Sequence, residues 1–433
     1  MKPSRIVPVV AVIAIVLGFD LGVSRAASAC LSIGGSTAPV SLGATLQFTA
    51  QCCSAVPALP DHGWGLATLL VITGMLALGG RRAKKIGLLT LSIAVLGFAR
   101  PATGQSCGAP FSWHAQSANE VFPGTGASFS FTPTLAGTFV VSLSDSVETA
   151  ATVTVQVTAP PKVFLILMEN NNWSSIKGSA SAPYINSLLT TGAHAEQYFN
   201  PPGLHPSEPN YLWLEAGTNF GVTNDNNPSS NSQTTTAHLV TQLTAAGHSW
   251  KAYQEDISGT VCPLVAVNKY APKHCPMVFF TDVTDNNSTT SANCIAHIRP
   301  YTELAADLAA NTTADYNFIT PNLCDDMHDT CAPTSNAIKQ GDTWLSTEVP
   351  KIQASSAYKN GAVILITWDE AGTGDGPIGL VALGNAVKVS YMNTVHYTHS
   401  STLRTVQEIF GLSPFLGDAA NAVDLSDLFV ALP

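Results

Sequence analysis

The chain has 433 residues, of which 45% are hydrophobic and only 11% are charged, and its formal net charge at pH 7 is −10. An ordinary soluble domain has about 25% charged residues, so the composition favours an exported protein over a cytosolic one. The tight basic run is RRAKK at residues 81–85. Nucleic-acid binding is therefore disfavoured, because it needs lysines and arginines gathered on one face.

The first 29 residues are typical of a secretory signal peptide. Lys2 and Arg5 precede the apolar segment IVPVVAVIAIVLGF, and small residues at 26–29 offer a cleavage region. The sequence therefore predicts that the mature protein is exported. Residues 30–62 are interpreted as an exported linker.

Two further apolar segments occupy residues 63–99, on either side of RRAKK. GWGLATLLVITGMLALGG (63–80) is about long enough to span a bilayer, and IGLLTLSIAVLGFA (86–99) is shorter. One interpretation is a membrane hairpin with RRAKK in the cytoplasm, which would associate the protein with the membrane. The other is a second signal peptide that begins at Met75. Both place the C-terminal part in the periplasm, at the cell surface or in the medium.

Residues 107–158 contain short runs of β type, among them ASFSFTPT, GTFVVSLSD and ATVTVQV. They resemble the last strands of a small immunoglobulin-like sandwich. The segment shows no residues arranged for catalysis, and its predicted role is that of a spacer. Pro160 and Pro161 are interpreted as the linker to the following domain.

From residue 162 to about residue 430, apolar strands alternate with helical segments. Continuous apolar runs, as expected of strands buried on both faces, are VFLILM (163–168), AVILITW (362–368) and PIGLVALG (377–384), and YNFIT (316–320) is a further strand. Helices are expected between them, for example at residues 235–246 and 401–411. This alternation predicts an α/β fold with a mostly parallel central sheet and helices on both faces.

Polar residues that suit a metal follow three of these strands, and they are Glu169, Asn170, Asp326, His328, Asp329, Asp369 and Glu370. Ligands of such folds bind beyond the carboxyl ends of the strands, so we expect these side chains at one sheet edge. Clustered carboxylates repel one another and need a cation or a shared proton. The set therefore predicts a divalent metal ion with oxygen-rich ligands.

A nucleophile for this site is expected at Ser207, within GLHPSEPNYLWL (203–214). Pro209 suits an early helical position, which would place Ser207 at a helix N-terminus, where backbone N–H groups favour an anion. His205 lies two residues before Ser207, and His399 precedes a predicted helix. Read alone, the segment is equally consistent with a surface turn.

Six motifs in this order resemble the phosphoesterase family, which groups acid phosphatases with non-haemolytic phospholipases C in the alkaline phosphatase superfamily. They are MENNNW (168–173), HPSEPNYL (205–212), WKAYQED (250–256), ITPNLCDDMHDT (319–330), ILITWDE (364–370) and YTHSSTLRTVQEIFGL (397–412). The resemblance covers roughly residues 162–430, and HPSEPNY is closer to the acid-phosphatase branch.

The resemblance implies roles for individual residues. The implied metal ligands are Glu169, Asn170, Ser207, Asp369 and Glu370. Ser207 would also be the nucleophile that forms a phosphoseryl intermediate. The residues implied to bind phosphate, protonate the leaving group or hold a second metal are His205, His328, His399, Asp326 and Asp329.

The sequence thus predicts an exported, metal-dependent phosphomonoesterase. One alternative is a phospholipase C that cleaves phospholipid head groups. Others are a serine esterase, although no GxSxG motif is present, and a non-catalytic surface protein. Among the nine cysteines, the pairs Cys324–Cys331 and Cys262–Cys275 are expected to form disulfides.

Overall fold

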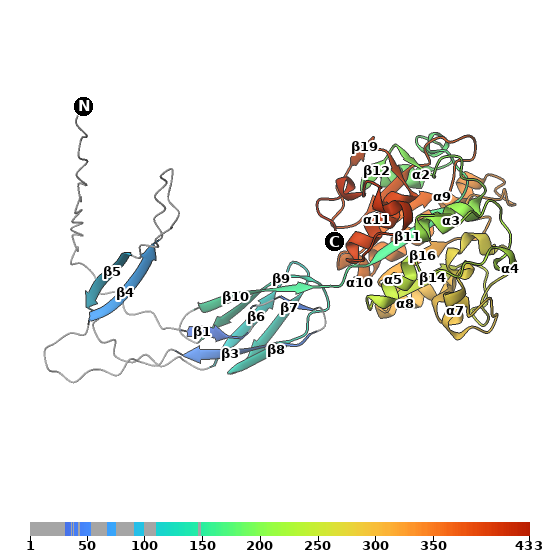
Figure 1. The fold of residues 1–433 in the computed structure, drawn as a ribbon. Coiled ribbons are helices and arrows are strands. Elements are labelled where there is room, and N and C mark those ends of the chain that lie inside the picture. The colour runs from blue at the N-terminus through green and yellow to red at the C-terminus, as the bar shows by residue number, and fades with distance from the viewer. Residues whose placement is uncertain are drawn as a thin grey trace, which may run out of the picture.

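The computed structural model describes residues 31–35, 37, 39–41, 44–52, 67–74, 91–98, 110–145 and 149–433 (Figure 1). The predicted signal peptide lies outside these residues. Strands β4 (Ala67–Gly74) and β5 (Leu91–Phe98) pair antiparallel. Among the described residues, no helix is long and apolar enough to cross a membrane. The interpretation of residues 63–99 as a hairpin or a second signal stays a prediction.

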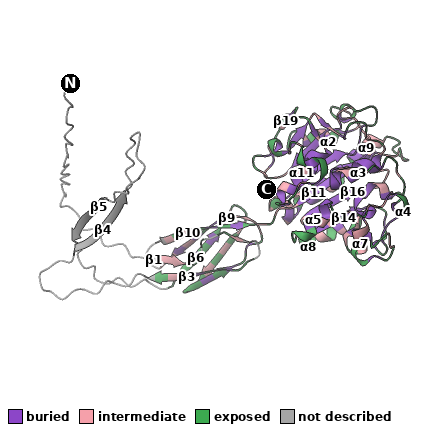
Figure 2. Ribbon diagram, in the orientation of Figure 1, coloured by how far each residue is buried: buried purple, intermediate pink, exposed green. Residues whose placement is uncertain are grey.

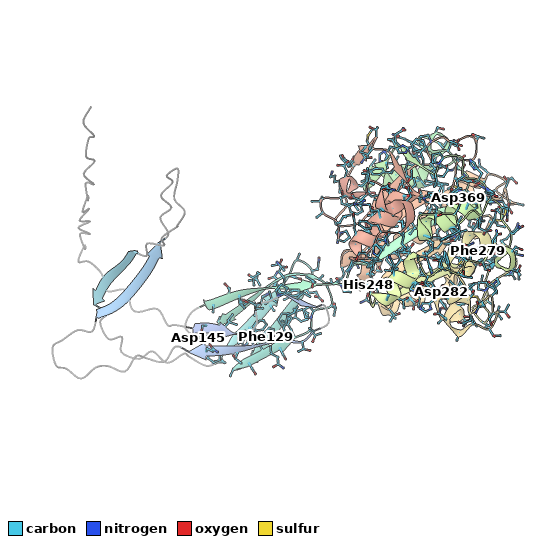
Figure 3. All side chains as sticks on the ribbon, viewed as in Figure 1. Phe129, Asp145, His248, Phe279, Asp282 and Asp369 are labelled. Atoms are coloured by element: carbon cyan, nitrogen blue, oxygen red, sulfur yellow. A yellow bond between two sulfur atoms is a disulfide. The ribbon has the colours of Figure 1, made fainter. Side chains whose placement is uncertain are left out.

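Two antiparallel-rich sheets pack face to face upstream of the α/β domain (Figure 1). One contains β1 (Leu31–Gly34), β3 (Leu46–Cys52) and β8 (Ser128–Phe131), and the other contains β2 (Val40–Ser41), β10 (Thr149–Thr158), β9 (Gly137–Ser144), β6 (Ser112–Gln116) and β7 (Val121–Thr125). Alternate side chains of β9 are buried, which is expected of a strand with one face on a core. Phe129 lies in this sandwich (Figure 3).

The sandwich differs from the sequence interpretation at its start. Residues 31–52, interpreted as part of a linker, supply strands β1, β2 and β3. Phe48 from β3 is fully buried and stacks on Phe131 of β8. The apolar segments separate these short strands in sequence from the other strands of the sandwich. The sequence therefore gave no indication that they pair with β8 and β10.

The α/β domain is built on an eight-stranded sheet in the order β15-β14-β16-β11-β17-β18-β12-β19. Its strands in chain order are β11 (Val163–Met168), β12 (Ala193–Ala195), β14 (Trp250–Gln254), β15 (Ile298–Pro300), β16 (Tyr316–Thr320), β17 (Val363–Trp368), β18 (Leu380–Leu383) and β19 (Tyr391–Asn393). The first five in spatial order are mutually parallel, whereas β18 is antiparallel to both neighbours. The predicted mostly parallel sheet is confirmed.

Helices cover the sheet, and every residue of β11 and β17 is buried (Figure 2). The helices are α1 (Trp173–Ile176), α2 (Pro183–Leu188), α3 (Ser207–Ala216), α4 (Pro228–Asn231), α5 (Leu239–Ala245), α6 (Thr281–Thr284), α7 (Ala292–His297), α8 (Leu304–Ala310), α9 (Ala337–Ala354), α10 (Ser356–Lys359) and α11 (His399–Ile409). Helix α3 packs against α11 and α5, and α9 packs against α2 and α8. Burial of the central strands on both faces explains their unbroken apolar sequences.

One of the two predicted disulfides is confirmed and the other is wrong. Cys324–Cys331 is present. Cys262 pairs with Cys294, not with Cys275, which is a buried free thiol. Closeness in sequence misled the prediction. The N–H of Cys262 donates to the carbonyl of Thr289 at 2.9 Å, which brings the chain just before α7 beside Cys262.

A buried ion cluster fixes the C-terminal end of α3. His238 is fully buried, with its Nδ1 2.9 Å from Glu215 Oε1 on α3 and its Nε2 3.1 Å from Asp282 Oδ1. Burial alone would lower the pKa of His238, but hydrogen bonds to Asp282 and Glu215 outweigh it and raise the pKa to about 9. The imidazolium therefore ties the helix that carries Ser207 to α5 and α6.

The folded protein should lose stability as the pH rises from about 6.5 to about 9. Below the unfolded pKa the charged His238 contributes fully, and its contribution disappears as the pH passes the raised folded value. The loss is up to about 3 kcal/mol. Urea unfolding across this range should show that slope in the wild type and in the exposed control His114→Gln, and a flatter one in His238→Gln. Equal slopes in all three proteins would contradict the charged cluster.

Candidate active site

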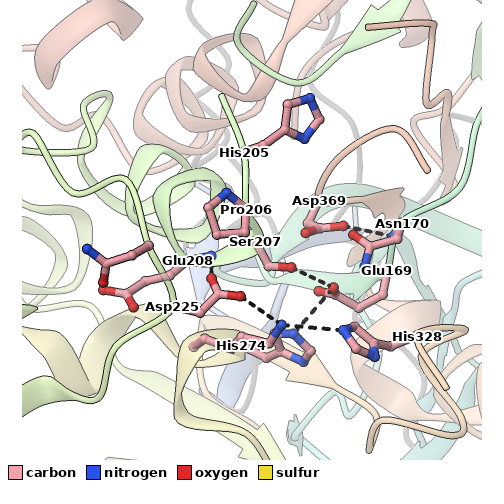
Figure 4. Close-up of polar contacts among 12 residues, drawn as sticks. Glu169, Asn170, His205, Pro206, Ser207, Glu208, Asp225, His274, His328 and Asp369 are labelled. Atoms are coloured by element: carbon pink, nitrogen blue, oxygen red, sulfur yellow. Dashed lines mark hydrogen bonds and ion pairs between the residues drawn. The ribbon is translucent and has the colours of Figure 1, made fainter. Parts of the chain in front are cut away.

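Ser207 is the first residue of α3, as the sequence predicts (Figure 4). Pro206 precedes it in an extended conformation, with φ −77° and ψ −156°, so the chain enters the helix at Ser207. The side chain is 1% exposed, and its Oγ donates to Glu169 Oε2 at 3.1 Å. The hydroxyl is thus held beside a strand-end carboxylate, at the positive end of a helix.

Glu169 and Asn170 follow β11, and Asp369 and Glu370 follow the neighbouring strand β17. Asn170 has a left-handed backbone with φ 44°, and its N–H donates to Asp369 Oδ1 at 2.9 Å. One end of its side-chain amide lies 3.2 Å from Asp369 Oδ1 and 3.1 Å from Glu370 Oε1. Either the amide nitrogen donates to both carboxylates, or the amide oxygen faces them as ligands face a shared cation.

His274 completes the inner part of the cluster, and sequence reasoning missed it. The side chain is 2% exposed, with Nε2 3.3 Å from Glu169 Oε2 and Nδ1 3.2 Å from Asp326 Oδ2. Its ring stacks on Tyr211, which donates a hydrogen bond to Glu169 Oε1. His274 lies in a 3-10 turn rather than at a strand end, so the strand-end rule gave no signal for it.

The outer part consists of His328 and Asp225 (Figure 4) and of Lys273, which contacts both of them. His328 Nδ1 contacts Asp329 Oδ1 at 2.8 Å, and Lys273 Nζ lies 3.4 Å from His328 Nε2. Lys273 Nζ also pairs with Asp225 Oδ2 at 3.0 Å, while Asp225 Oδ1 accepts the N–H of Glu208 in α3. Burial would lower the pKa of Lys273, but the carboxylates of Glu169 and Asp225 raise it. The lysine therefore keeps its positive charge beside the carboxylates.

His399 and His205 are placed differently from the other predicted residues. His399 is fully buried, donates from Nε2 to the carbonyl oxygen of Asp369 and accepts at Nδ1 from Tyr198 at 3.1 Å. Burial lowers its pKa to about 4, so it is neutral and lies behind Asp369. His205 has a 41% exposed side chain, pairs with Glu370 through Nδ1 and lies 3.3 Å from Asp375 through Nε2.

Burial disfavours the ionised form of the carboxylates in the cluster. Burial raises the pKa of Glu169, of Asp326 to about 7 and of Glu370 to about 8, and burial together with Glu169 raises that of Asp369 well above its ordinary value. Such shifts mean that the ionised forms lack sufficient positive charge around them. A bound cation would supply it.

Unpartnered buried atoms point the same way. Asp369 Oδ2 has no hydrogen-bond partner among the described residues, and Asp326 Oδ2 and His274 Nε2 have only their contacts at 3.2 and 3.3 Å with His274 Nδ1 and Glu169 Oε2. One ligand atom each from Glu169, His274 and His328 lie within 4.8 Å of one another. Oxygen and imidazole donors at this spacing suit a divalent metal ion. The residues present are therefore suitable ligands for a divalent metal ion. Glu169 belongs both to the group with His274 and His328 and to the group with Asn170, Asp369 and Glu370.

Comparison with known proteins identifies relatives of this chain. A model of the phosphoesterase family matches residues 168–413. A phosphatidylinositol-3-phosphatase of Mycobacterium tuberculosis is 32% identical over 269 residues, which are 62% of this chain and 82% of that protein. An acid phosphatase of Aspergillus fumigatus is 30% identical over 271 residues, covering 59% of this chain and 56% of the fungal protein.

A solved structure from Vibrio parahaemolyticus, described as a protein in the alkaline phosphatase superfamily, is 10% identical with a TM-score of 0.41. The match covers 62% of this chain and 71% of that one.

Removing divalent metal should destabilise the α/β domain. A ligand that binds only the folded state at a hundred times its Kd adds about 3 kcal/mol, so chelation should lower the unfolding free energy by about that amount. In Asp369→Asn the difference between metal-loaded and chelated protein should shrink, because one buried charge is gone. Asp427→Asn, at a half-exposed carboxylate that pairs with Lys388 outside the cluster, should respond like the wild type. An unfolding curve that chelation leaves unchanged in the wild type would refute the metal site.

Proposed function

The chain belongs to the phosphoesterase family and is a hydrolase of phosphate esters, and from this premise we propose an exported, metal-dependent phosphomonoesterase. The observation that carries the proposal is the contact between Ser207 Oγ and Glu169 at the start of α3, inside a cluster of buried carboxylates. Export is supported by the sequence of residues 1–29.

The proposed reaction begins with Ser207. Its oxygen attacks the phosphorus in line, the bond from phosphorus to the ester oxygen breaks, and the alcohol leaves with a proton. Water then attacks the phosphoseryl group, so that inorganic phosphate is released and the serine hydroxyl is restored. Glu169 Oε2 accepts the hydrogen bond of the serine hydroxyl, which orients the oxygen and favours loss of its proton.

The metal would be held by Glu169, Asn170, Ser207, Asp369 and Glu370, and His274 offers a further donor beside Glu169. A divalent ion bound there supplies a Lewis acid that offsets negative charge on the phosphate and lowers the pKa of a bound hydroxyl. Without it, the carboxylates would repel an anionic substrate.

His328 is proposed as the acid that protonates the leaving alcohol. Asp329 lies 2.8 Å from its Nδ1 and orients the ring, so that Nε2 faces Lys273 at 3.4 Å. A carboxylate that holds one nitrogen of an imidazole leaves the other free to exchange a proton. Lys273 is proposed to contact the phosphate, because it is the cation that lies between His328 and Asp225.

His399 is proposed to position Asp369 rather than to touch phosphate. Both of its ring nitrogens are engaged, one by the Asp369 carbonyl and one by Tyr198. Tyr211, which lies in α3, is proposed to position Glu169 through its hydrogen bond to that carboxylate. His205, at the rim, is proposed to meet the substrate as it enters.

A monoester is favoured over the phospholipid head group of the phospholipase C alternative. The relatives are named an acid phosphatase and a phosphatidylinositol-3-phosphatase, and both names describe release of a phosphate group. Membership of an enzyme family together with the assembled cluster argues against a non-catalytic surface protein.

Ser207→Ala should abolish phosphate release from phenyl phosphate, with a loss of about a thousandfold or more in kcat, because the substitution removes the attacking oxygen. The matched control is Ser230→Ala, an exposed serine in α4. Denaturation of the wild-type enzyme after a short exposure to radiolabelled substrate should leave label on Ser207. Full turnover by Ser207→Ala would remove the serine from the mechanism, and faster hydrolysis of a phosphodiester than of the monoester would favour the phospholipase alternative.

A further inference from the structure

A cleft of about 800 Å³ opens at the same sheet edge as the candidate active site. Residues at the ends of three neighbouring strands line it: Glu255 follows β14, Pro300 ends β15 and Asn322 lies just after β16. These strands run parallel to β11, so their carboxyl ends lie on the edge that carries Glu169. We call this hollow the side cleft.

One loop joins the side cleft to the candidate active site. The loop after β16 contains Asn322, which lines the cleft and donates its N–H to Glu255 Oε2 at 2.9 Å. The same loop carries His328, whose ring lies beside Glu169. In the sheet only β16 separates β14 from β11. At about 4.8 Å between neighbouring strands, the cleft begins ~10 Å from β11, the strand that leads into Glu169.

The wall of the side cleft is mostly apolar. Val261, Leu264, Val265 and Val267 line it together with the ring of Tyr301. The three valines are exposed to solvent, with relative exposures of 48% for Val261, 60% for Val265 and 43% for Val267. A concave group of exposed apolar side chains beside a reactive centre is typical of a small-molecule site.

The charges in the side cleft exclude a second phosphate site. Its charged lining residues are Glu255 and Asp256, and neither lysine nor arginine lines it. An anion would meet only negative charge there. Glu255 is in addition engaged by Trp344, whose Nε1 donates to it at 2.8 Å. The wall therefore suits an uncharged apolar group.

We propose that the side cleft binds the apolar body of the alcohol from which the candidate active site removes phosphate. The proposal rests on the phosphomonoesterase function above and adds the class of alcohol, one with an aromatic ring system or a hydrocarbon chain. The volume falls within the ~300–1,000 Å³ of small-molecule sites. An ester with its phosphorus at Ser207 extends its alcohol past the end of β16 into the cleft.

The test compares two monoesters, naphthyl phosphate and glycerol phosphate, in the full chain and two variants. Val265→Asp places a charge in the cleft at an exposed position, and Val389→Asp is the matched control, at a valine that is 72% exposed and does not line the cleft. Val265→Asp should lower kcat/KM about tenfold for naphthyl phosphate, the range expected for a hydrophobic pocket group. Its kcat/KM for glycerol phosphate should stay within about twofold of the wild type, since a polar alcohol of that size makes no use of an apolar wall.

A direct binding measurement separates the two proposals. Fluorescence of naphthol titrated with the protein should report binding to the wild type and to Val389→Asp, and about tenfold weaker binding to Val265→Asp. Naphthol binding that Val265→Asp leaves unchanged, or an equal loss of kcat/KM for both esters, overturns the side-cleft proposal. Normal naphthol binding by a chain that hydrolyses neither ester overturns the phosphomonoesterase function and leaves the cleft as an apolar binding site.

Discussion

The α/β domain depends on one electrostatic constraint: several carboxylates are buried at one sheet edge with little positive charge around them. Glu169, Asp326 and Asp369 are all fully buried; Lys273 is a cation near Glu169 and Asp369, and His274, whose pKa burial lowers, contacts Glu169 and Asp326. Burying an ionised carboxylate is costly unless it is paired. A bound divalent cation would offset this cost, and it would also offset the negative charge of an incoming phosphate ester.

The secondary structure around the cluster serves to hold it rigid. Three parallel strands deliver the acidic loops, and α3 presents Ser207 at its first residue. The far end of α3 is fixed by the buried contact of Glu215 with His238, and α11 packs along it. The helix is therefore held at both ends, and the serine hydroxyl cannot drift from Glu169 without breaking contacts in the core. Behind the strand end, His399 holds the backbone of Asp369.

The apolar strand runs predicted the sheet and placed Glu169, Asn170, Asp369 and Glu370 at one of its edges, and the family resemblance added Ser207 to them. The sequence did not predict His274 or Lys273, since both lie in a short 3-10 turn whose position is set by tertiary packing. The position of His399 behind Asp369 also depends on tertiary packing. The sequence of a helix start does not indicate in which direction a histidine ring points. The pairing of Cys262 with Cys294 and the entry of residues 31–52 into the sandwich are likewise long-range contacts.

The most direct test of the central claim is to locate metal in crystals of the metal-loaded protein by anomalous diffraction. A metal bound as proposed should give an anomalous peak within coordination distance, about 2.0–2.6 Å, of Glu169, Asp369 and the Ser207 hydroxyl. An active, fully metal-loaded crystal with no peak between those three side chains would contradict it, because the buried carboxylates would then have to be stabilised by protonation alone.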